Sequence, residues 1–195
     1  MSEGAKSVGS RQVAVIGAGV AGLSAAVSLA ERGFRPVLIE AKGELGGEAS
    51  EFACKGLDRC VRCDVCLARD LVRKAKSLGI ERIRNARPTE LSGRKGAFRL
   101  GFRVKDSVSS TIAACAIVLA IGAVPYDPTE DRRLGYGILK DVMSAYDAEV
   151  QHARTGRLLV PSTGSAPGSV AFVQCVGSRD VRAEVVLSSL CSKVC

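Results

Sequence analysis

Hydrophobic and polar positions near the start of the chain predict a strand, a helix and a second strand in succession. An apolar run at residues 13–16 is followed by a Gly-rich turn, and residues 20–32 then carry apolar side chains at helical spacing. Gly33 ends this pattern before a second apolar run at residues 37–39. A strand, a crossover helix and a strand in this order predict a parallel βαβ unit.

The patterning changes twice further along the chain. Residues 66–78 carry an apolar stripe at helical spacing, and a short strand is expected at residues 80–83. From residue 87 the period becomes two, which predicts an antiparallel β-meander. Its strands are expected at residues 89–91, 98–104 and 111–121, with a turn at Ser92 and Gly93 after the first of them.

The pattern is looser after Pro125, where prolines flank a predicted helix at residues 142–152 and a predicted strand at residues 170–175. We therefore expect two domains, residues 1–124 with a Cys-rich loop at 46–66, and residues 125–195. The last nine residues, LSSLCSKVC, stop within a helical pattern that has no cap. We expect the second domain to be the truncated start of a nucleotide-binding-like domain and the chain to be the N-terminal piece of a longer protein.

Composition narrows the class of protein. With 195 residues, 47% of them hydrophobic, the chain can form a substantial core. It has no apolar run long enough for a membrane span and no signal-peptide pattern, so we expect a cytoplasmic protein without a transmembrane segment. The net charge of +8 is spread over many segments and accompanies no nucleic-acid motif. It favours an anionic cofactor or an acidic redox partner over nucleic acid.

The turn between the first strand and the first helix reads GAGVAG and forms a dinucleotide-binding fingerprint. Gly17 permits the tight turn, Gly19 lets the backbone approach a pyrophosphate, and Gly22 lets the helix pack on the strand. Glu40 ends the second strand, where a carboxylate accepts hydrogen bonds from ribose hydroxyls and disfavours a 2′-phosphate. The fingerprint leaves NAD and FAD open. The contacts it assigns are Gly17, Ala18, Gly19, Val20, Ala21, Gly22, Glu40, Ala41 and Lys42.

Half of the eight cysteines form one compact cluster. Cys54, Cys60, Cys63 and Cys66 follow the spacing C-x5-C-x2-C-x2-C, which lets four thiolates converge on one centre. Cytosolic thiols stay reduced, so metal or redox ligands are expected rather than disulfides. Zinc ribbons pair two separated CxxC knuckles, whereas this compact set beside a dinucleotide motif favours an iron–sulfur cluster.

Two further segments resemble flavoproteins of the two-dinucleotide-binding-domain type. One is Leu45-Gly46-Gly47, shortly after the acid, and the other is the strand at residues 117–121 with the Gly122-Ala123-Val124-Pro125 that follows it. The β-meander between them also matches the connection in that family. The resemblance implies FAD rather than NAD, with an α/β Rossmann-type domain that carries a β-meander and a Cys-rich insertion. The FAD contacts it adds are Gly46, Gly47, Arg87, Pro88, Ile121 and Gly122.

The chain also resembles the family of heterodisulfide reductase A subunits over residues 12–195. The resemblance rests on AFVQCVGSRD at residues 171–180, LCSKVC at 190–195, YDPTEDRRLGYG at 126–137 and GRKGAFRLGFRV at 93–104. The Cys-rich phrase at residues 46–68 is most similar to the short subunits of sulfur-oxidising complexes. This resemblance implies an FAD-dependent and 4Fe-4S-dependent oxidoreductase component.

The same resemblance implies a second 4Fe-4S cluster held by Cys175, Cys191 and Cys195. The chain departs from the family pattern here. Leu190 stands where an aromatic residue is usual, the spacer between the two blocks is longer, and the sequence stops where the second cysteine of an adjacent pair would stand. We therefore expect the second cluster to be incomplete in this chain.

Three functions follow from these residues. The first is an electron-transfer subunit of a heterodisulfide reductase-like complex linked to thiol and disulfide metabolism, with other subunits and a second copy of the chain as candidate partners. The second is a pyridine-nucleotide-disulfide reductase-like flavoprotein that uses a redox pair such as Cys60 and Cys63. The third is a zinc-stabilised binding module without redox activity. No catalytic residue is assigned, and Cys115 is expected to be a core residue.

Overall fold

The computed structural model describes residues 11–56, 58–61, 63, 65–105, 108–174 and 176–177. Contacts divide the chain into two units, Met1–Gly122 and Ala123–Cys195. The sequence-based boundary was expected two residues further on, after residue 124. The nature of the second unit as a nucleotide-binding-like domain stays a prediction.

The first unit contains a parallel sheet of four strands in the order β3-β2-β1-β7. Two helices connect its strands, so that the predicted strand, helix and strand at the start of the chain form a βαβ crossover. This confirms the α/β, Rossmann-type fold. The elements are β1 (Gln12–Ile16), α1 (Val20–Glu31), β2 (Arg35–Ile39), the 3-10 turn η1 (Glu48–Glu51), α2 (Leu67–Ser77), β3 (Glu81–Ile83) and β7 (Ala116–Leu119).

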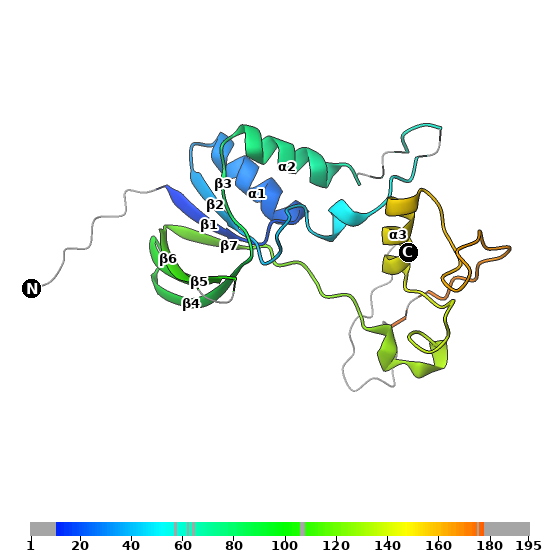
Figure 1. The fold of residues 1–195 in the computed structure, drawn as a ribbon. Helices are drawn as coiled ribbons and strands as arrows, with labels where there is room; N and C mark the ends of the chain where they lie inside the picture. Colours follow the sequence, from blue (N-terminus) through cyan, green and yellow to red (C-terminus); the bar gives the residue numbers. More distant parts are fainter. Residues whose placement is uncertain are drawn as a thin grey trace, which may run out of the picture. The chain divides into compact units, whose positions relative to one another are not determined.

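A second sheet of three antiparallel strands, in the order β4-β5-β6, is inserted between β3 and β7. Its strands are β4 (Ala86–Arg94), β5 (Ala97–Val104) and β6 (Val108–Ala114). Helices α1 and α2 lie on one face of the parallel sheet and the β4–β6 sheet lies on the other (Figure 1).

Residues of β1 contribute to the cores on both faces of the parallel sheet. Val13 and Val15 pack with the helices in one core cluster, whereas Ala14 and Ile16 pack with β5 and β6 in another. Because both faces of β1 are buried, its residues form a continuous apolar run rather than an alternating one. The dinucleotide fingerprint therefore begins at the end of the most buried strand.

The predicted turn at Ser92 and Gly93 is wrong, because β4 continues through both residues. Gly93 pairs with Phe98 on β5, and a methyl group on Gly93 would lie 2.2 Å from the carbonyl oxygen of Ala97. This glycine thus allows a close approach of two strands. The hairpin turns instead at Lys95 and Gly96, between the paired residues Arg94 and Ala97.

The single strand predicted at residues 111–121 is also wrong, because it is two strands with different partners. Strand β6 ends at Ala114 in the antiparallel sheet, and β7 begins at Ala116 beside β1 in the parallel sheet. Cys115 lies between them, half-buried against the helix-side core, and its N–H donates to the carbonyl of Gln12 at 2.8 Å. The period-two pattern runs through this change of partner without a break.

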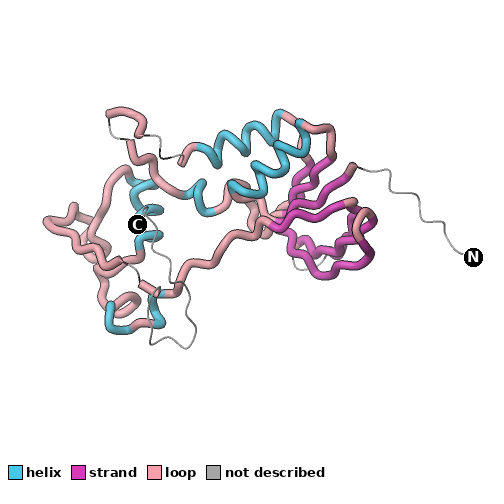
Figure 2. The backbone as a smooth tube through the Cα atoms, turned by 180° about the vertical axis from the view of Figure 1, so that it is seen from behind, coloured by secondary structure: helices cyan, strands magenta, loops and turns pink. Residues whose placement is uncertain are grey.

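The described part of the second unit contains helical turns and loops (Figure 2). Its elements are η2 (Pro128–Glu130), η3 (Arg132–Leu134) and α3 (Ala145–Thr155). The helix predicted at residues 142–152 is present, and it begins where the Ser144 side chain and Asp147 form a capping box. The predicted strand at residues 170–175 is wrong over residues 170–174, which have no strand partner among the described residues. Within the described ranges, the structure has no helix long and apolar enough to cross a membrane.

Candidate dinucleotide-binding site

The loop at residues 17–22 needs glycine at its first and last positions. Gly17 has a φ of +96°, and a methyl group there would lie 2.2 Å from the carbonyl oxygen of Ala120 at the end of β7. A methyl group on Gly22 would lie 1.9 Å from the carbonyl oxygen of Gly17. Gly17 is needed because its backbone is left-handed, and Gly22 is needed because α1 packs closely against the loop.

The N-terminus of α1 is open to an anion. Gly19 is the N-cap residue and supplies no side-chain hydrogen bond, so the N–H groups of Val20, Ala21 and Gly22 have no acceptor within the helix. These groups and the helix dipole together favour negative charge. The loop therefore has the donors that a pyrophosphate needs.

Glu40 is the one charged residue in the described core, with 8% of its surface exposed. Its Oε2 accepts a hydrogen bond of 2.7 Å from the N–H of Ala18, and its Oε1 accepts one of 2.7 Å from the N–H of Lys42. A carboxylate offers about four acceptor positions, so each oxygen can accept a further hydrogen bond. Ribose hydroxyls are suitable donors, whereas a 2′-phosphate would be repelled.

The segment with Gly46 and Gly47 lies directly against the phosphate loop. The N–H of Gly46 donates to the carbonyl of Ala18 at 2.8 Å, and Gly46 forms a parallel bridge with Gly19. A methyl group on Gly47, whose φ is +63°, would lie 2.9 Å from the Cα of Gly19. Two glycine segments separated in sequence thus form one surface of bare backbone.

Two residues that the sequence analysis did not single out hold this surface in place. Ser50 donates from its hydroxyl to the carbonyl of Gly47 at 2.7 Å, and its N–H donates to the same carbonyl. Asn85, at a φ of +54°, donates from its N–H to the carbonyl of Lys42. Asparagine is one of the few residues that tolerate such a φ, which is the one sequence signal that could have indicated its role.

The remaining predicted FAD contacts lie at the same end of the parallel sheet. Ala86 donates its N–H to the carbonyl of Glu40 at 2.8 Å. Arg87 and Pro88 follow Ala86 directly, so their backbone lies close to Glu40. Ile121 and Gly122 follow Ala120, whose carbonyl faces Gly17. The carboxyl ends of β1, β2 and β7 therefore bring all these segments to one edge, which is where open α/β sheets bind ligands.

The four clustered cysteines lie in the loop between η1 and α2, and all four are exposed. Among the described residues, no three His, Cys, Asp or Glu side chains lie close enough together to hold a metal ion. The backbone N–H groups of Val65 and Lys55, helped by the charge of Lys55, lower the pKa of the Cys63 thiol. A lowered pKa favours the thiolate, which is the form that binds metals.

This donor set fits a soft metal centre in its chemistry. The four cysteines lie in a loop that no β-ladder holds in place. In such sites, binding of the metal often brings the thiolates together. Its end also lies near the dinucleotide segment, because Cys66 and Leu45 line one open cavity of about 510 Å³. The other residues that line this cavity are Ser50, Arg69, Asp70, Val72 and Arg73.

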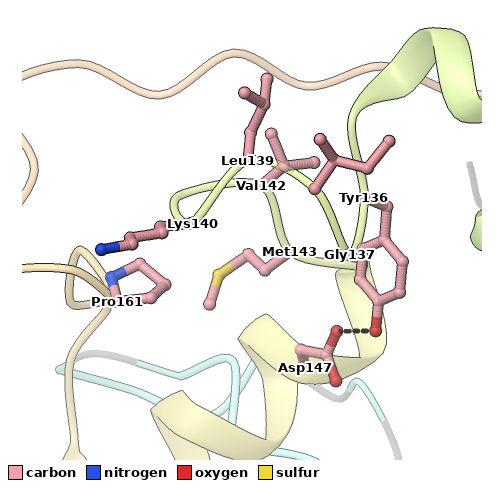
Figure 3. A pocket seen from close by; sticks show the side chains of 9 residues that line it. Tyr136, Gly137, Leu139, Lys140, Val142, Met143, Asp147 and Pro161 are labelled. Atoms are coloured by element: carbon pink, nitrogen blue, oxygen red, sulfur yellow. Dashed lines mark hydrogen bonds between the residues drawn. The ribbon is translucent and has the colours of Figure 1, made fainter.

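The second unit has a cavity of its own, of about 480 Å³ (Figure 3). Tyr136 and Asp147 lie on one side of it, where the tyrosine hydroxyl donates to Oδ2 of the carboxylate at 2.8 Å. Lys140, Met143 and Pro161 line the rest together with neighbouring apolar side chains. Cys175, Cys191 and Cys195, the ligands predicted for a second cluster, lie outside the described residues.

The strand order, the glycine loop at the end of β1 and the buried acid at the end of β2 define a Rossmann-type dinucleotide-binding domain. Residues 15–68 match the sequence model of the NAD(P)-binding Rossmann-like domain family. The match therefore includes the phosphate loop, the acid and the cysteine loop.

Longer similarity is found to components of heterodisulfide reductases. The chain is 24% identical, over 95% of its length, to the A subunit of the ferredoxin:CoB-CoM heterodisulfide reductase of Methanosarcina mazei, of which it covers 33%. It is 25% identical, over 93% of its length, to an iron-sulfur A subunit of the CoB–CoM heterodisulfide reductase of Methanopyrus kandleri, of which it covers 39%. The similarity expected from the sequence motifs is thereby confirmed, and the chain spans between a third and two fifths of these relatives.

Solved structures align with a smaller part of the chain. The L-proline dehydrogenase from P. horikoshii aligns over 58% of this chain and 22% of its own, with 28% identity and a TM-score of 0.46. The thioredoxin reductase of Lactococcus lactis aligns over 60% of this chain and 37% of its own, with 20% identity and a TM-score of 0.47.

Proposed function

We propose that this chain binds FAD and a 4Fe-4S cluster and acts as an electron-transferring part of a heterodisulfide reductase-like oxidoreductase. The single observation that carries the proposal is the contact of the Gly46–Gly47 segment with the phosphate loop at Gly19. The cysteine loop begins a few residues after this contact. Leu45, which precedes this segment, and Cys66 line one cavity, so a cofactor on the glycine surface would lie near this proposed cluster ligand.

The choice of FAD rests on the residues around the phosphate loop. Glu40 disfavours NADP, since a buried carboxylate would face its 2′-phosphate. Between NAD and FAD, the resemblance of residues 45–47 and 117–125 to flavoproteins favours FAD. The pyrophosphate would lie at Gly17, Gly19 and the N-terminus of α1, and the adenine ribose at Glu40. The backbone of Arg87 and Pro88 would lie beside the adenine, and Gly46, Gly47, Ile121 and Gly122 would line the rest.

The proposed cluster ligands are Cys54, Cys60, Cys63 and Cys66. When bound, a flavin exchanges electrons in pairs or singly and an iron–sulfur cluster passes them one at a time, so the two together connect two-electron and one-electron carriers. The roles of this chain's residues are to hold the pyrophosphate, to fix the ribose and to supply thiolates. The lowered pKa of Cys63 supports the last of these roles.

The partners and the setting of this activity are further parts of the proposal. Relatives in methanogens are named as A subunits of heterodisulfide reductases, which supports assembly of this chain with other proteins. A link to sulfur or disulfide substrates is supported by the same names and by the cysteine-rich phrase, and a cytoplasmic setting is part of the proposal. A closer kinship with sulfur-oxidising complexes, a homodimer and a second cluster at Cys175, Cys191 and Cys195 stay predictions.

The lowered pKa of Cys63 also suits a second candidate, a dithiol reductase in which Cys60 and Cys63 exchange with a disulfide. The two functions differ in their need for iron. A dithiol reductase uses the pair without metal, whereas the electron-transfer protein needs all four thiolates.

Anaerobic reconstitution tests the proposal. The protein is incubated with FAD, ferrous iron and sulfide, desalted, and analysed for bound flavin, iron and sulfide, with NAD offered in place of FAD as a control. We expect flavin retention that NAD does not displace, together with about four iron atoms per chain. Flavin without iron would favour the dithiol reductase, zinc alone would favour a binding module, and the absence of both flavin and iron would refute both redox assignments.

A further inference from the structure

The outer face of the β4–β6 sheet carries a concentration of arginine side chains. On β5, Leu100 and Phe102 are buried against the parallel sheet, and the residues between and beside them point to the opposite face. We call this opposite face the arginine face. Its four arginines are Arg87 and Arg94 on β4 and Arg99 and Arg103 on β5, and all of them are exposed.

Like charges stand directly opposite each other on this face. Arg87 pairs in register with Arg103 across β4 and β5. Opposite residues on neighbouring strands have Cβ atoms only about 4.5–5.5 Å apart, and like charges at that distance are destabilising. A sheet that keeps such a pair has a charge arrangement that the fold alone does not need.

Acids among the described residues do not neutralise this charge. Among the described residues, none of the ion pairs involves Arg87, Arg94, Arg99 or Arg103. Glu90 is the one acid that the register places on the same face, opposite Gly101. Four arginines against one glutamate leave an excess of three positive charges on the face.

We propose that the arginine face is a docking surface for an acidic surface of a partner protein. Guanidinium groups present fixed forks of donors that match carboxylates in pairs, so several of them on a rigid sheet fit a surface rich in Asp and Glu. A partner's carboxylates between Arg87 and Arg103 would relieve their mutual repulsion. Charge complementarity of this kind accelerates association and selects the partner.

The other residues of the arginine face do not suit a nucleic acid or a lipid surface as the partner. The register fills its remaining positions with Ser92, Ala97, Gly101, Ser109, Thr111 and Ala113, which are small or carry hydroxyl groups. The aromatic residues of β5, Phe98 and Phe102, point to the core side, so the face has no platform on which nucleic-acid bases could stack. The absence of a large apolar side chain among these positions also leaves nothing to insert into a lipid surface.

Apart from Arg87, the residues of the arginine face are not among the proposed cofactor contacts. The β4–β6 sheet lies on the face of the parallel sheet opposite to α1 and α2 (Figure 1). The register places the arginines on the face of the β4–β6 sheet that does not pack against the parallel sheet. Flavin binding and partner docking can therefore fail separately. Because the backbone of Arg87 belongs to the proposed FAD contacts, the substitutions below leave it unchanged.

The test compares two double variants that change the net charge equally. Arg99→Glu with Arg103→Glu reverses the arginine face, whereas Arg35→Glu with Arg157→Glu changes two exposed arginines elsewhere. The probe is a synthetic polyglutamate peptide, titrated calorimetrically into reconstituted protein at low and at physiological salt. We expect the first variant to weaken binding about tenfold more than the second, and the binding to weaken as salt rises.

A third variant separates loss of binding from loss of folding. Arg103→Thr removes the repulsion with Arg87 and suits a strand, so it should preserve or raise thermal stability while it weakens polyglutamate binding. Flavin absorbance should match wild type in every variant. The proposal is overturned if both double variants lose affinity equally, if Arg103→Thr binds as tightly as wild type, or if the arginine face binds duplex DNA or phosphatidylglycerol vesicles more tightly than polyglutamate.

Discussion

The N–H of Ala18 donates a hydrogen bond of 2.7 Å to Oε2 of Glu40, which stands 22 residues later at the end of the next strand. This bond connects the glycine loop to the acid that we propose to bind the ribose. The proposed pyrophosphate donors and the proposed ribose acceptor are therefore fixed relative to each other by the protein's own hydrogen bond. Pre-organisation of this kind reduces the cost of binding.

Replacement of Glu40 by Gln should weaken FAD binding. The amide keeps the size of the side chain but places an NH₂ group where one carboxylate oxygen accepts, so it must face the N–H of Ala18 or of Lys42. Hydrogen bonds to a charged group contribute about 1.5–3 kcal/mol each. We expect the Kd for FAD, measured by quenching of flavin fluorescence, to rise roughly tenfold to hundredfold.

Glu44→Gln is the matched control for this substitution. Glu44 lies four residues further on, and its side chain is 93% exposed. The Glu44→Gln substitution should therefore leave the Kd for FAD unchanged. Equal affinities for wild type and Glu40→Gln would exclude the proposed ribose contact.

Replacement of Gly47 by Ala should disrupt the contact with Gly19. Gly79→Ala is the control, because Gly79 has nearly the same φ of +66° but open space around its Cα. An alanine in the left-handed region costs about 1–2 kcal/mol, and both variants should lose that much in urea unfolding. Only Gly47→Ala adds a clash with backbone, so it should lose more stability and also bind FAD more weakly. Similar losses in the two variants would show that the two glycine segments do not touch.

The four clustered cysteines should act as a set in holding iron. A Ser substitution at Cys54, Cys60, Cys63 or Cys66 removes one thiolate, and we expect each to lower the bound iron after anaerobic reconstitution by more than half. Cys115→Ser should keep the iron content of wild type, since Cys115 packs against the core. Iron contents that do not differ between Cys115→Ser and the other variants would refute the assignment.

The contact between Tyr136 and Asp147 should make the stability of α3 depend on pH at both extremes. Burial raises the pKa of Asp147, but hydrogen bonds from Ser144 and Tyr136 outweigh it, and the pKa lies below its ordinary value of 3.8. The hydrogen bond to Asp147, then burial, raise the pKa of Tyr136 above 10.0. The carboxylate's contribution is therefore present above pH 3.8 and lost as the pH falls through the lowered pKa. The hydroxyl's contribution is present below pH 10.0 and lost as the pH rises through the raised pKa.

Tyr136→Phe tests this pH dependence. Loss of the hydroxyl should destabilise α3 by about 1 kcal/mol at neutral pH, since the contact is partly exposed to water. It should also remove the alkaline loss of stability. Amide hydrogen exchange of α3 at a series of pH values measures both effects, and an alkaline loss that persists in Tyr136→Phe would contradict the account.

Local chemistry made much of the site predictable from the sequence. Gly17 and Gly22 are required by clashes within one βαβ unit, and Glu40 ends the strand of the same unit, so their roles are visible in a short stretch of sequence. The fold class followed from the same unit. Helix α2 was predictable because its apolar stripe faces a single core.

Features that depend on distant partners were not predictable. Gly93 resembles a turn residue in sequence, yet it is needed because the backbone of Ala97 approaches it across the hairpin. The change from β6 to β7 at Cys115 depends on Gln12, more than a hundred residues earlier, whose carbonyl accepts a hydrogen bond from the N–H of Cys115. Ser50 holds Gly47 through its hydroxyl and N–H, and Asn85 holds Lys42 through its N–H, and neither contact belongs to a sequence motif.

The visible spectrum of the anaerobically reconstituted protein, before and after dithionite, tests the central claim that one chain holds both a flavin and an iron–sulfur cluster. We predict structured flavin bands above a broad shoulder in wild type, both bleached by dithionite. In Cys60→Ser the broad shoulder should disappear while the flavin bands remain. Flavin bands alone in wild type, or a colourless protein after reconstitution, would contradict the account.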